Sequence, residues 1–246
     1  MQNTAHRAKI TVSADGTGLV SQAGMVLLAE AARVTGLGQG LSAGLARWRA
    51  PRAVHDPGKI VTDLVVALAL GGDCLADIAV LRSSPEVFGL VASDPAVSRL
   101  VNTLAQAGPK ALRLIRKARA AAREHVWKLA GQAAPGMGRR LIPLDLDATI
   151  VIAHSEKESA APTWKKTFGF HPLCSFIDHG PGGTGEAAVL ALRRGNAGSN
   201  TADDHITVSR AALRQIPSHL HKQVLIRTDS GGGTREFLNW VASRRL

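Results

Sequence analysis

The alternation of apolar and polar residues is most regular in residues 141–155, which read LIPLDLDATIVIAHS. Leucine and isoleucine at 144, 146, 150 and 152 alternate with polar residues, which is the period-two pattern of a half-buried strand. Side chains two residues apart share a face, so Asp145 and Asp147 point the same way. Two such carboxylates repel each other unless water or a cation reaches them, and Mg²⁺ prefers carboxylate ligands. The stretch therefore predicts either a divalent-metal site or a strand end with two solvated acids.

Five segments in the first 130 residues have the periodicity and end signals of helices. Asp56 and Pro57 form an N-cap followed by proline at the first helical position, and Gly71-Gly72 ends that helix. A short strand-and-turn signal, KITVSADGTG, precedes them at residues 9–18. The predicted helices are 25–34, 57–70, 73–82, 96–105 and 110–129.

Residues 73–82 and 96–105 are two short helices joined by a turn that contains proline and glycine, and Asp94 is expected to cap the second. This arrangement is compatible with a helix-turn-helix. In that interpretation Ser98, Arg99 and Asn102 lie on the exposed face of the second helix and reach phosphates or base edges of DNA. An ordinary helical bundle explains the same pattern, so both interpretations stay open.

Basic residues are concentrated in the first part of the chain. Residues 1–140 hold 18 Lys and Arg against 9 Asp and Glu, whereas residues 141–246 hold 12 and 10. This excess favours a nucleic-acid partner, although basic, alanine- and arginine-rich chains also arise from genomic composition. Helix 110–129 has seven basic residues and one acid, so phosphate contact explains its charged face better than solvation alone. The side chains expected to stay solvated and contact DNA there are Arg113, Arg116, Lys117 and Arg123.

The two cysteines and the hydropathy of the chain exclude several classes of protein. Cys74 and Cys174 lie far apart without metal-ligand spacing, which argues against a disulfide framework or a zinc site and indicates buried cysteines in a reducing compartment. No apolar run reaches the roughly 18 residues of a membrane span, and the polar start lacks a signal peptide's hydrophobic region. We therefore expect a cytoplasmic protein that does not contact a membrane.

The second part of the chain has an α/β pattern. Residues 131–140, GQAAPGMGRR, are expected to be a linker because of their glycine and proline content. Connections too short for crossover helices predict an antiparallel meander of the first three strands, and a later buried strand is expected to return beside the first. That return would bring Asp229, at its end, next to Asp147. The predicted elements after 141–155 are strands 168–176, 186–192 and 223–228, and helices 201–213 and 235–243.

Asp229 stands where an apolar strand meets the glycine-rich turn SGGGT. Open α/β sheets present ligand-binding groups at such strand ends. Two acids from neighbouring strand ends make half of a two-metal site, in which ions about 4 Å apart polarise a phosphodiester and stabilise the leaving oxygen. Asp145 is either a further metal ligand or an orienting neighbour. His154, Glu156 and Lys157, just beyond the first strand, either contact DNA or form a solvated loop, and we favour the loop.

Several long segments resemble the DDE-type transposases of bacterial insertion sequences. They are HDPGKIVTDLVVALALGGDCLADIAVLR, FGLVASDPAVSRL, DLDATIVIAHSEKESAAPTWKKTFGFHPL, RRGNAGSNTADDH and LIRTDSGGGT, and they span most of the chain. The resemblance implies a ribonuclease-H-like catalytic domain in residues 141–246, incomplete, after a helical DNA-binding region in residues 1–130. It assigns the catalytic acids that bind Mg²⁺ or Mn²⁺ to Asp147 and Asp229. It also implies double-stranded DNA with terminal inverted repeats as partner, assembly as a homo-oligomer on DNA, and a place at the bacterial nucleoid.

The family's third acid, a glutamate on a helix after a fifth strand, has no counterpart in this sequence, because Glu236 follows Asp229 by only seven residues. We therefore expect a truncated transposase without activity of its own. A non-catalytic DNA-binding protein derived from a transposase is the main alternative. DLDAT also fits the DxDxT signature of haloacid-dehalogenase-like phosphatases, in which Asp145 would be the nucleophile, but such enzymes need parallel strands with helical crossovers after the motif.

Overall fold

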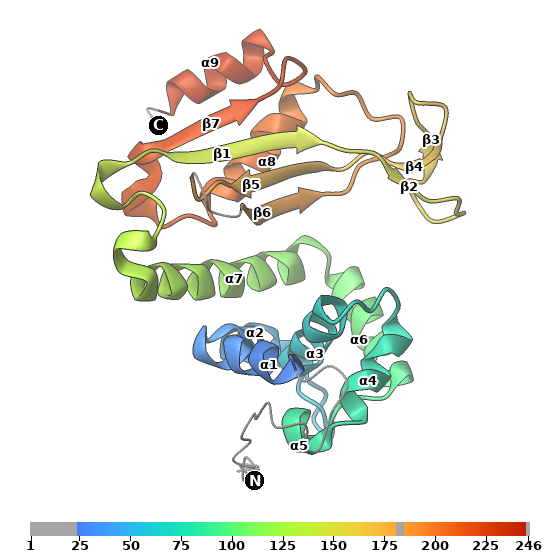
Figure 1. Ribbon diagram of the computed structural model, residues 1–246. Coiled ribbons are helices and arrows are strands. Elements are labelled where there is room, and N and C mark those ends of the chain that lie inside the picture. The colour runs from blue at the N-terminus through green and yellow to red at the C-terminus, as the bar shows by residue number, and fades with distance from the viewer. Residues whose placement is uncertain (1–23, 181–184, 245–246) are drawn as a thin grey trace. The chain divides into compact units, whose positions relative to one another are not determined.

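The computed structural model describes residues 24–180 and 185–244, and the chain divides into two compact units, Met1–His125 and Val126–Leu246 (Figure 1). The strand-and-turn signal expected at residues 9–18 lies outside the described residues. Among the described residues, those of unit 1 form helices, and all the strands lie in unit 2. Each unit has its own cluster of buried apolar side chains.

Unit 1 is built from helices whose apolar faces meet around Ile60, Ile78, Leu81 and Val97, all at most 5% exposed. The expected N-cap is confirmed, because the Asp56 carboxylate accepts a hydrogen bond from the Lys59 amide at 2.8 Å. The helices that begin in unit 1 are α1 (Met25–Val34), α2 (Leu37–Leu45), α3 (Pro57–Ala69), α4 (Ala79–Arg82), α5 (Pro85–Phe88), α6 (Asp94–Ala107) and α7 (Pro109–Ala130), and the last residues of α7 belong to unit 2.

Two expectations for unit 1 are wrong. The helix expected at residues 73–82 is a 3-10 turn, Leu75–Ile78, followed by the four-residue α4, and α5 intervenes before α6. Asp94 does not cap α6, since Ser93 holds the N-cap position and the Asp94 carboxylate instead accepts a hydrogen bond from Arg82 at 2.8 Å. The ion pair with Arg82 therefore replaces the local cap that the Asp-Pro sequence indicated.

Unit 2 contains a four-stranded sheet in the order β6-β5-β1-β7. The strands β1 (Ile142–Ala148), β5 (Leu173–Ile177) and β6 (Glu186–Ala191) form the expected antiparallel meander, and β7 (Val224–Thr228) returns parallel to β1. The mixed α/β architecture predicted from the sequence is thus confirmed. A second, small sheet consists of β2 (Val151–Ile152), β4 (Phe168–Phe170) and β3 (Ala161–Pro162).

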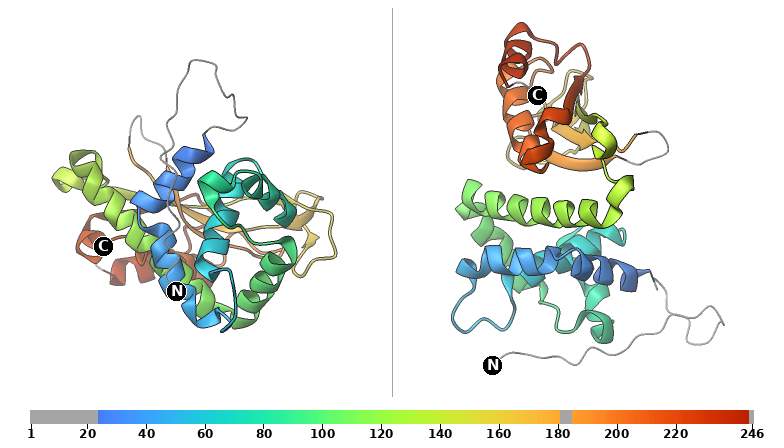
Figure 2. Two further views of the ribbon diagram at one scale, coloured as in Figure 1. Left: turned by 90° about the horizontal axis from the view of Figure 1, so that it is seen from below. Right: turned by 90° about the vertical axis from the view of Figure 1, so that its left-hand side faces the viewer.

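One face of the larger sheet forms the core of unit 2. Leu144, Leu146 and Ile177 are at most 3% exposed and pack with side chains of α8 (Ala202–Leu213) and α9 (Arg235–Ser243). Figure 2 shows these two helices, in orange and red, together on one side of the strands. The opposite face carries Asp145, Asp147 and Arg227, so the alternation in the sequence separates a helix-covered face from a polar face.

Three strand predictions need correction. The regular stretch at residues 141–155 divides into β1 and β2, which belong to different sheets, and residues 168–176 divide into β4 and β5 in the same way. His171-Pro172 lies at the second break, where proline cannot donate to a ladder. Strand 223–228 was expected to be buried, but only Val224 is, because Leu225 and Arg227 point to the polar face.

Candidate active site at the ends of two parallel strands

Asp147 and Asp229 lie side by side at the carboxyl ends of β1 and β7. Leu146 is the register partner of Thr228, and each of these residues is followed directly by one of the two aspartates. Both aspartates are exposed. No described residue donates a hydrogen bond to the Asp147 carboxylate. The strand return expected from the sequence is therefore confirmed, and it places two accessible carboxylates at one edge of the sheet.

The turn after β7 fixes Asp229. The Gly232 amide donates to both the carboxylate and the carbonyl oxygen of Asp229, each at 3.2 Å. A Cβ at Gly232 would lie 2.0 Å from Thr228 Oγ1 and 2.9 Å from His205 Nε2, so only glycine fits. Thr234 then caps α9 by accepting a hydrogen bond from the Phe237 amide at 3.3 Å. The sequence indicated the turn, but not its close contact with helix α8.

The side chain of His205 on α8 lies against this turn at Gly232. It is 2% exposed, and its Nδ1 lies 2.9 Å from the carbonyl oxygen of Thr201. A carbonyl only accepts, so Nδ1 carries the proton in this bond. The imidazole also packs 5.4 Å from the ring of Phe237. Helix α8 and helix α9 therefore both hold the ring that lies beneath Gly232, a support that the sequence pattern did not reveal.

Asp145 is engaged in an ion pair. Arg227, its register partner on β7, donates from Nε and Nη2 to the two Asp145 carboxylate oxygens at 2.6 and 2.8 Å. The same Nη2 donates to Asp178 at 2.7 Å. A hydrogen bond from the Gly180 amide and the Arg227 guanidinium together hold the pKa of Asp178 below its ordinary value, and the two carboxylates raise the pKa of Arg227. A metal ion at Asp145 would compete with this guanidinium for the same carboxylate oxygens.

A profile of the family described as transposase DDE domain group 1 matches residues 2–246. The chain belongs to the DDE-type transposases. The resemblance found in the sequence is thus confirmed at the level of the family, whose members use divalent metals and act on DNA. Comparisons with curated proteins and with solved structures found no match. Within the described residues, no helix of the transposase is long and apolar enough to cross a membrane.

The transposase has another cluster of metal-binding residue types, in unit 1. Among the described residues, the only group of three His, Cys, Asp or Glu side chains with ligand atoms within 4.8 Å of one another is Asp73, Cys74 and Asp77. Its geometry has a structural cause, because the Asp77 carboxylate accepts hydrogen bonds from the Asp73 and Cys74 amides at 2.8 and 2.9 Å. These bonds cap the 3-10 turn and lower the pKa of Asp77. We therefore assign this cluster to capping.

The cysteines differ from each other. Cys174 is buried, as expected, whereas Cys74 is exposed, which corrects the expectation of two core cysteines. Cys174 is the register partner of Asp147 on β5. Burial, and then the negative charge of Asp147, raise the pKa of its thiol. The thiol next to the aspartate is therefore kept protonated and is a poor metal ligand.

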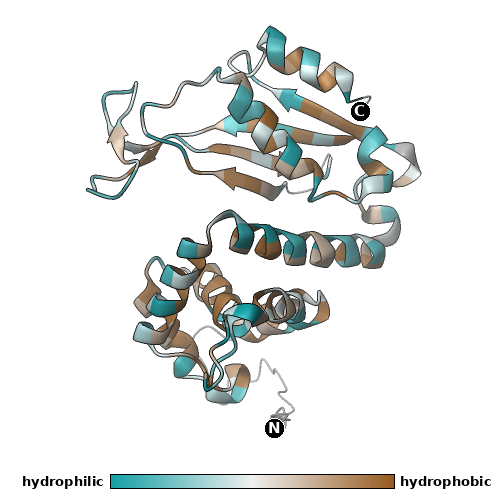
Figure 3. Ribbon diagram, turned by 180° about the vertical axis from the view of Figure 1, so that it is seen from behind, coloured by the Kyte–Doolittle hydropathy of each residue, from teal (hydrophilic) through white to brown (hydrophobic). Residues whose placement is uncertain are grey.

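The residues predicted to contact DNA lie on α6 and α7. In Figure 3, hydrophilic (teal) and hydrophobic (brown) residues alternate along α7. Arg99, Asn102, Arg113 and Lys117 are exposed, as is Ser98, and Arg116 is half-buried. Arg123 is an exception, because it is only 7% exposed. It precedes the buried Trp127 by one helical turn and shares its face of the helix, so the expectation that it is solvated is wrong.

The loop after β2 contains the remaining sequence candidates. His154 stacks on Phe168, with ring centroids 6.1 Å apart, and Glu156 and Lys157 are exposed outside any strand. None of these three is paired with Asp147 or Asp229 in the structure. The interpretation as a surface loop agrees with this placement.

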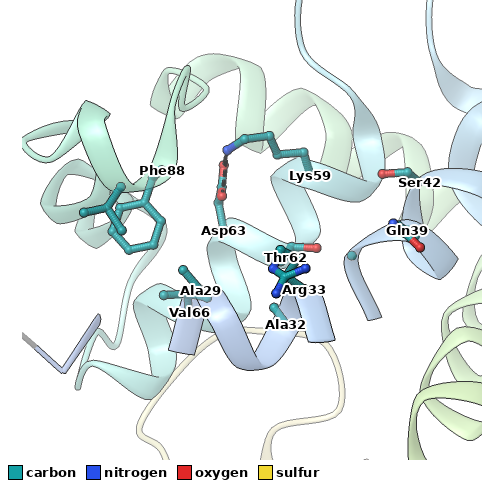
Figure 4. Close-up of a pocket in the computed structure, with 12 residues that line it drawn as sticks. Ala29, Ala32, Arg33, Gln39, Ser42, Lys59, Thr62, Asp63, Val66 and Phe88 are labelled. Carbon is teal, nitrogen blue, oxygen red and sulfur yellow. Dashed lines mark hydrogen bonds and ion pairs between the residues drawn. The ribbon is translucent and has the colours of Figure 1, made fainter. Parts of the chain in front are cut away.

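Unit 1 also contains a pocket of about 480 Å³ between α1, α2, α3 and α5 (Figure 4). Its walls are largely apolar, with Ala29, Val66 and Phe88 on one side in the close-up. The buried carboxylate in it, Asp63, accepts from Lys59 Nζ at 2.6 and 2.9 Å. Burial raises the pKa of Asp63 even though Lys59 opposes the shift. Its charge is already matched by Lys59, so the pocket lacks the group of accessible acids that a metal site needs.

Proposed function

We propose that the transposase binds divalent metal through Asp147 and Asp229 and that this edge of the sheet is where a DNA phosphodiester is positioned. The observation that carries the proposal is the register of β1 and β7, which puts the two aspartates at the same level on adjacent strands. Mg²⁺ and Mn²⁺ take carboxylate and water oxygens, so two exposed carboxylates fit such an ion. When bound, the metal would polarise the phosphodiester and stabilise the leaving oxygen.

In this proposal Asp145 orients its neighbours and does not bind the metal directly. Its oxygens are occupied by Arg227, which also holds Asp178. The Gly232 turn keeps the Asp229 carboxylate at the strand end, and the backbone of Asp147 is held by the pairing of β1 with β5. The chain's own residues therefore supply two ligands and the framework that orients them.

We further infer that unit 2 is ribonuclease-H-like and that residues 1–130, followed by the linker at 131–140, form the DNA-binding region. The antiparallel meander followed by a strand parallel to the first supports the first inference. The exposed cations of α6 and α7 and the excess of basic residues before residue 140 support the second. Recognition of terminal inverted repeats and assembly of a homo-oligomer on DNA belong to the same proposal.

Metal titration tests the proposed site. Calorimetry with Mn²⁺ on the wild type, Asp147→Asn and Asp229→Asn should give weak binding that either substitution abolishes. Glu236→Gln is the matched control, because it removes a nearby carboxylate at the start of α9 that the proposal does not use. Equal heats from all four proteins would remove the site.

We expect the 246-residue chain to be unable to carry out strand transfer, even if it binds DNA and metal. Among the described residues, Asp147 and Asp229 belong to no group of three His, Cys, Asp or Glu side chains whose ligand atoms all lie within 4.8 Å of one another. A misplacement of about 1 Å costs on the order of 100-fold in rate, so an ion that lacks a ligand is a poor catalyst. Mg²⁺-dependent cleavage of transposon-end DNA by the purified chain, lost in Asp147→Asn, would refute this expectation.

Two alternatives are distinguished by the same measurements. A non-catalytic DNA-binding protein would bind DNA but show no metal uptake at Asp147 and Asp229. The phosphatase interpretation disagrees with the structure, because β1 is followed by an antiparallel partner without a helical crossover. Its nucleophile would be Asp145, whose two oxygens already accept hydrogen bonds from Arg227.

A further inference from the structure

A basic pocket lies at the end of unit 2 opposite Asp147 and Asp229. It has a volume of about 600 Å³ and lies between the last turn of α8, the 3-10 segment Ser218–Gln223 and the end of α9. In Figure 1 this end of α9, marked C, lies beside the tail of the β7 arrow. Asp147 is the last residue but one of β1 and Asp229 directly follows β7, so both belong to the opposite ends of these parallel strands. We call it the α8–α9 basic pocket. The described residues that line it include no acid; they are Arg210, Leu213, Arg214, Ser218, His221, Lys222, Trp240 and Arg244.

Two of its arginines are held by an aromatic ring. The guanidinium carbons of Arg210 and Arg244 lie 5.6 and 5.0 Å from the centroid of Trp240, and neither side chain forms an ion pair with a described residue. A guanidinium placed against a ring face keeps its planar N–H donors available at its edge. Elsewhere in unit 2, the guanidinium groups of Arg193 and Arg227 form ion pairs with carboxylates. The pocket therefore contains oriented cations for which the described residues supply no counter-ion.

Helix dipoles explain only part of this cluster. Arg214 and Arg244 are the C-cap residues of α8 and α9, where a cation interacts favourably with the helix terminus. The carboxyl end of α8 already has a donor, because His221 Nε2 lies 2.8 Å from the carbonyl oxygen of Leu213. Arg210, in the last turn of α8, fits the same explanation. The dipoles do not, however, require these arginines to line one pocket together with Lys222, where the like charges repel one another. An anion would relieve that repulsion.

We propose that the α8–α9 basic pocket binds backbone phosphates of duplex DNA, as a contact separate from the catalytic edge. The proposal rests on the proposed function for the identity of the polyanion. Arginine binds phosphate oxygens through paired N–H donors, and each phosphate neutralised releases counterions. The charge balance of residues 141–246 is close to even, so this site was not predicted from the sequence. It gives the transposase a second DNA contact at the far end of the unit that carries Asp147 and Asp229.

The test compares two triple variants with the same change in net charge. Arg210→Ala, Arg214→Ala and Arg244→Ala together remove the pocket cations, and the control removes exposed cations elsewhere in unit 2: Lys165→Ala, Lys166→Ala and Arg194→Ala. Binding of a labelled duplex is measured at several salt concentrations. Loss of three phosphate contacts should lower the slope of log affinity against log salt by roughly 2.7 and the affinity at low salt at least about tenfold. The control should change the slope by less than about one.

Equal losses in both triple variants, or an unchanged slope in the pocket variant, would overturn the proposal. Arg210→Lys with Arg244→Lys guards against a folding artefact, because it keeps the charge and should weaken binding while leaving the slope nearly intact. Inorganic phosphate provides a further test. If phosphate stabilises the wild type but not the pocket variant, and both proteins bind DNA equally well, the pocket binds a free anion and the assignment to DNA is wrong. The pocket variant should bind Mn²⁺ with the heat of the wild type, so failure of the metal site is read separately by calorimetry.

Discussion

Substitution of Gly232 by alanine should both destabilise unit 2 and weaken the proposed metal site. The new methyl group would lie 2.0 Å from Thr228 Oγ1 and 2.9 Å from His205 Nε2, and His205 cannot retreat, because Thr201 and Phe237 hold its ring. Overpacking of this kind costs about 1–3 kcal/mol, and we expect the upper end here. For a unit of this size that loss lowers Tm by on the order of 10 °C. The displaced turn would also move Asp229, so Mn²⁺ affinity should fall at least tenfold.

Gly233→Ala is the matched control for this prediction. Its added Cβ would meet only the Ser230 carbonyl oxygen at 3.5 Å, an ordinary contact, so it should change Tm by less than about 2 °C. Adding Thr228→Ala to Gly232→Ala removes the nearest clashing atom and should restore part of the stability, which a double-mutant cycle measures. If the two glycine substitutions destabilise the protein equally, or if Mn²⁺ affinity is unchanged in Gly232→Ala, the role assigned to the turn is wrong.

The remaining predictions concern charge. Reversal of Arg113, Arg116 and Lys117 to glutamate should weaken duplex binding and reduce its salt dependence, and binding that is absent at low salt in the wild type would refute the electrostatic account. Burial raises the pKa of Asp63, so the folded state holds the carboxyl proton more tightly than the unfolded state does. The resulting stabilisation is complete below the pKa of the unfolded chain, about 3.9, and is lost as the pH rises through the raised pKa of the folded state. Urea unfolding should be measured from about pH 3.5, just below the reference value of about 3.9, to about pH 7. The free energy of unfolding of the wild type should fall relative to that of Asp63→Asn as the pH rises, and a pH-independent difference between the two proteins would contradict this. Arg227→Gln should raise the pKa of Asp178 toward its ordinary value, which carboxyl chemical shifts measure, and an unchanged titration would assign the shift to the Gly180 amide alone.

The sequence predicted correctly those helices whose ends are determined by neighbouring residues, such as a cap or a proline. Helix α9 has the predicted bounds because Thr234 caps it and an amphipathic stretch follows. Helix α3 begins at Pro57 because Asp56 and proline act on the adjacent turn. By contrast, the period-two pattern of residues 141–155 does not reveal that the strand leaves one sheet and enters another. That break depends on partners that lie distant in the sequence.

The candidate site divides in the same way. The return of a later strand beside β1 was predicted from the order of elements, so the pairing of Asp147 with Asp229 followed from the pattern, and the structure adds that β7 is parallel to β1. Arg227 was missed because residues 223–228 were interpreted as a buried strand, and its partner Asp145 lies 82 residues earlier. A basic residue at an alternating position in that segment was the available signal. His205 had no local signal, since its function in the fold depends on the close approach of the Gly232 turn.

The spacing of the two acids in β1 now has a physical explanation. Both point to the polar face, but only Asp145 lies opposite an arginine, so its negative charge is neutralised within the sheet. Asp147 stands one step further along the strand, where β7 ends and the opposing residue is another aspartate. Two adjacent carboxylates at a strand end repel each other, and a third charge beside them would increase that repulsion. The guanidinium of Arg227 removes that third charge, and this leaves Asp147 and Asp229 as the pair whose repulsion a divalent cation would relieve.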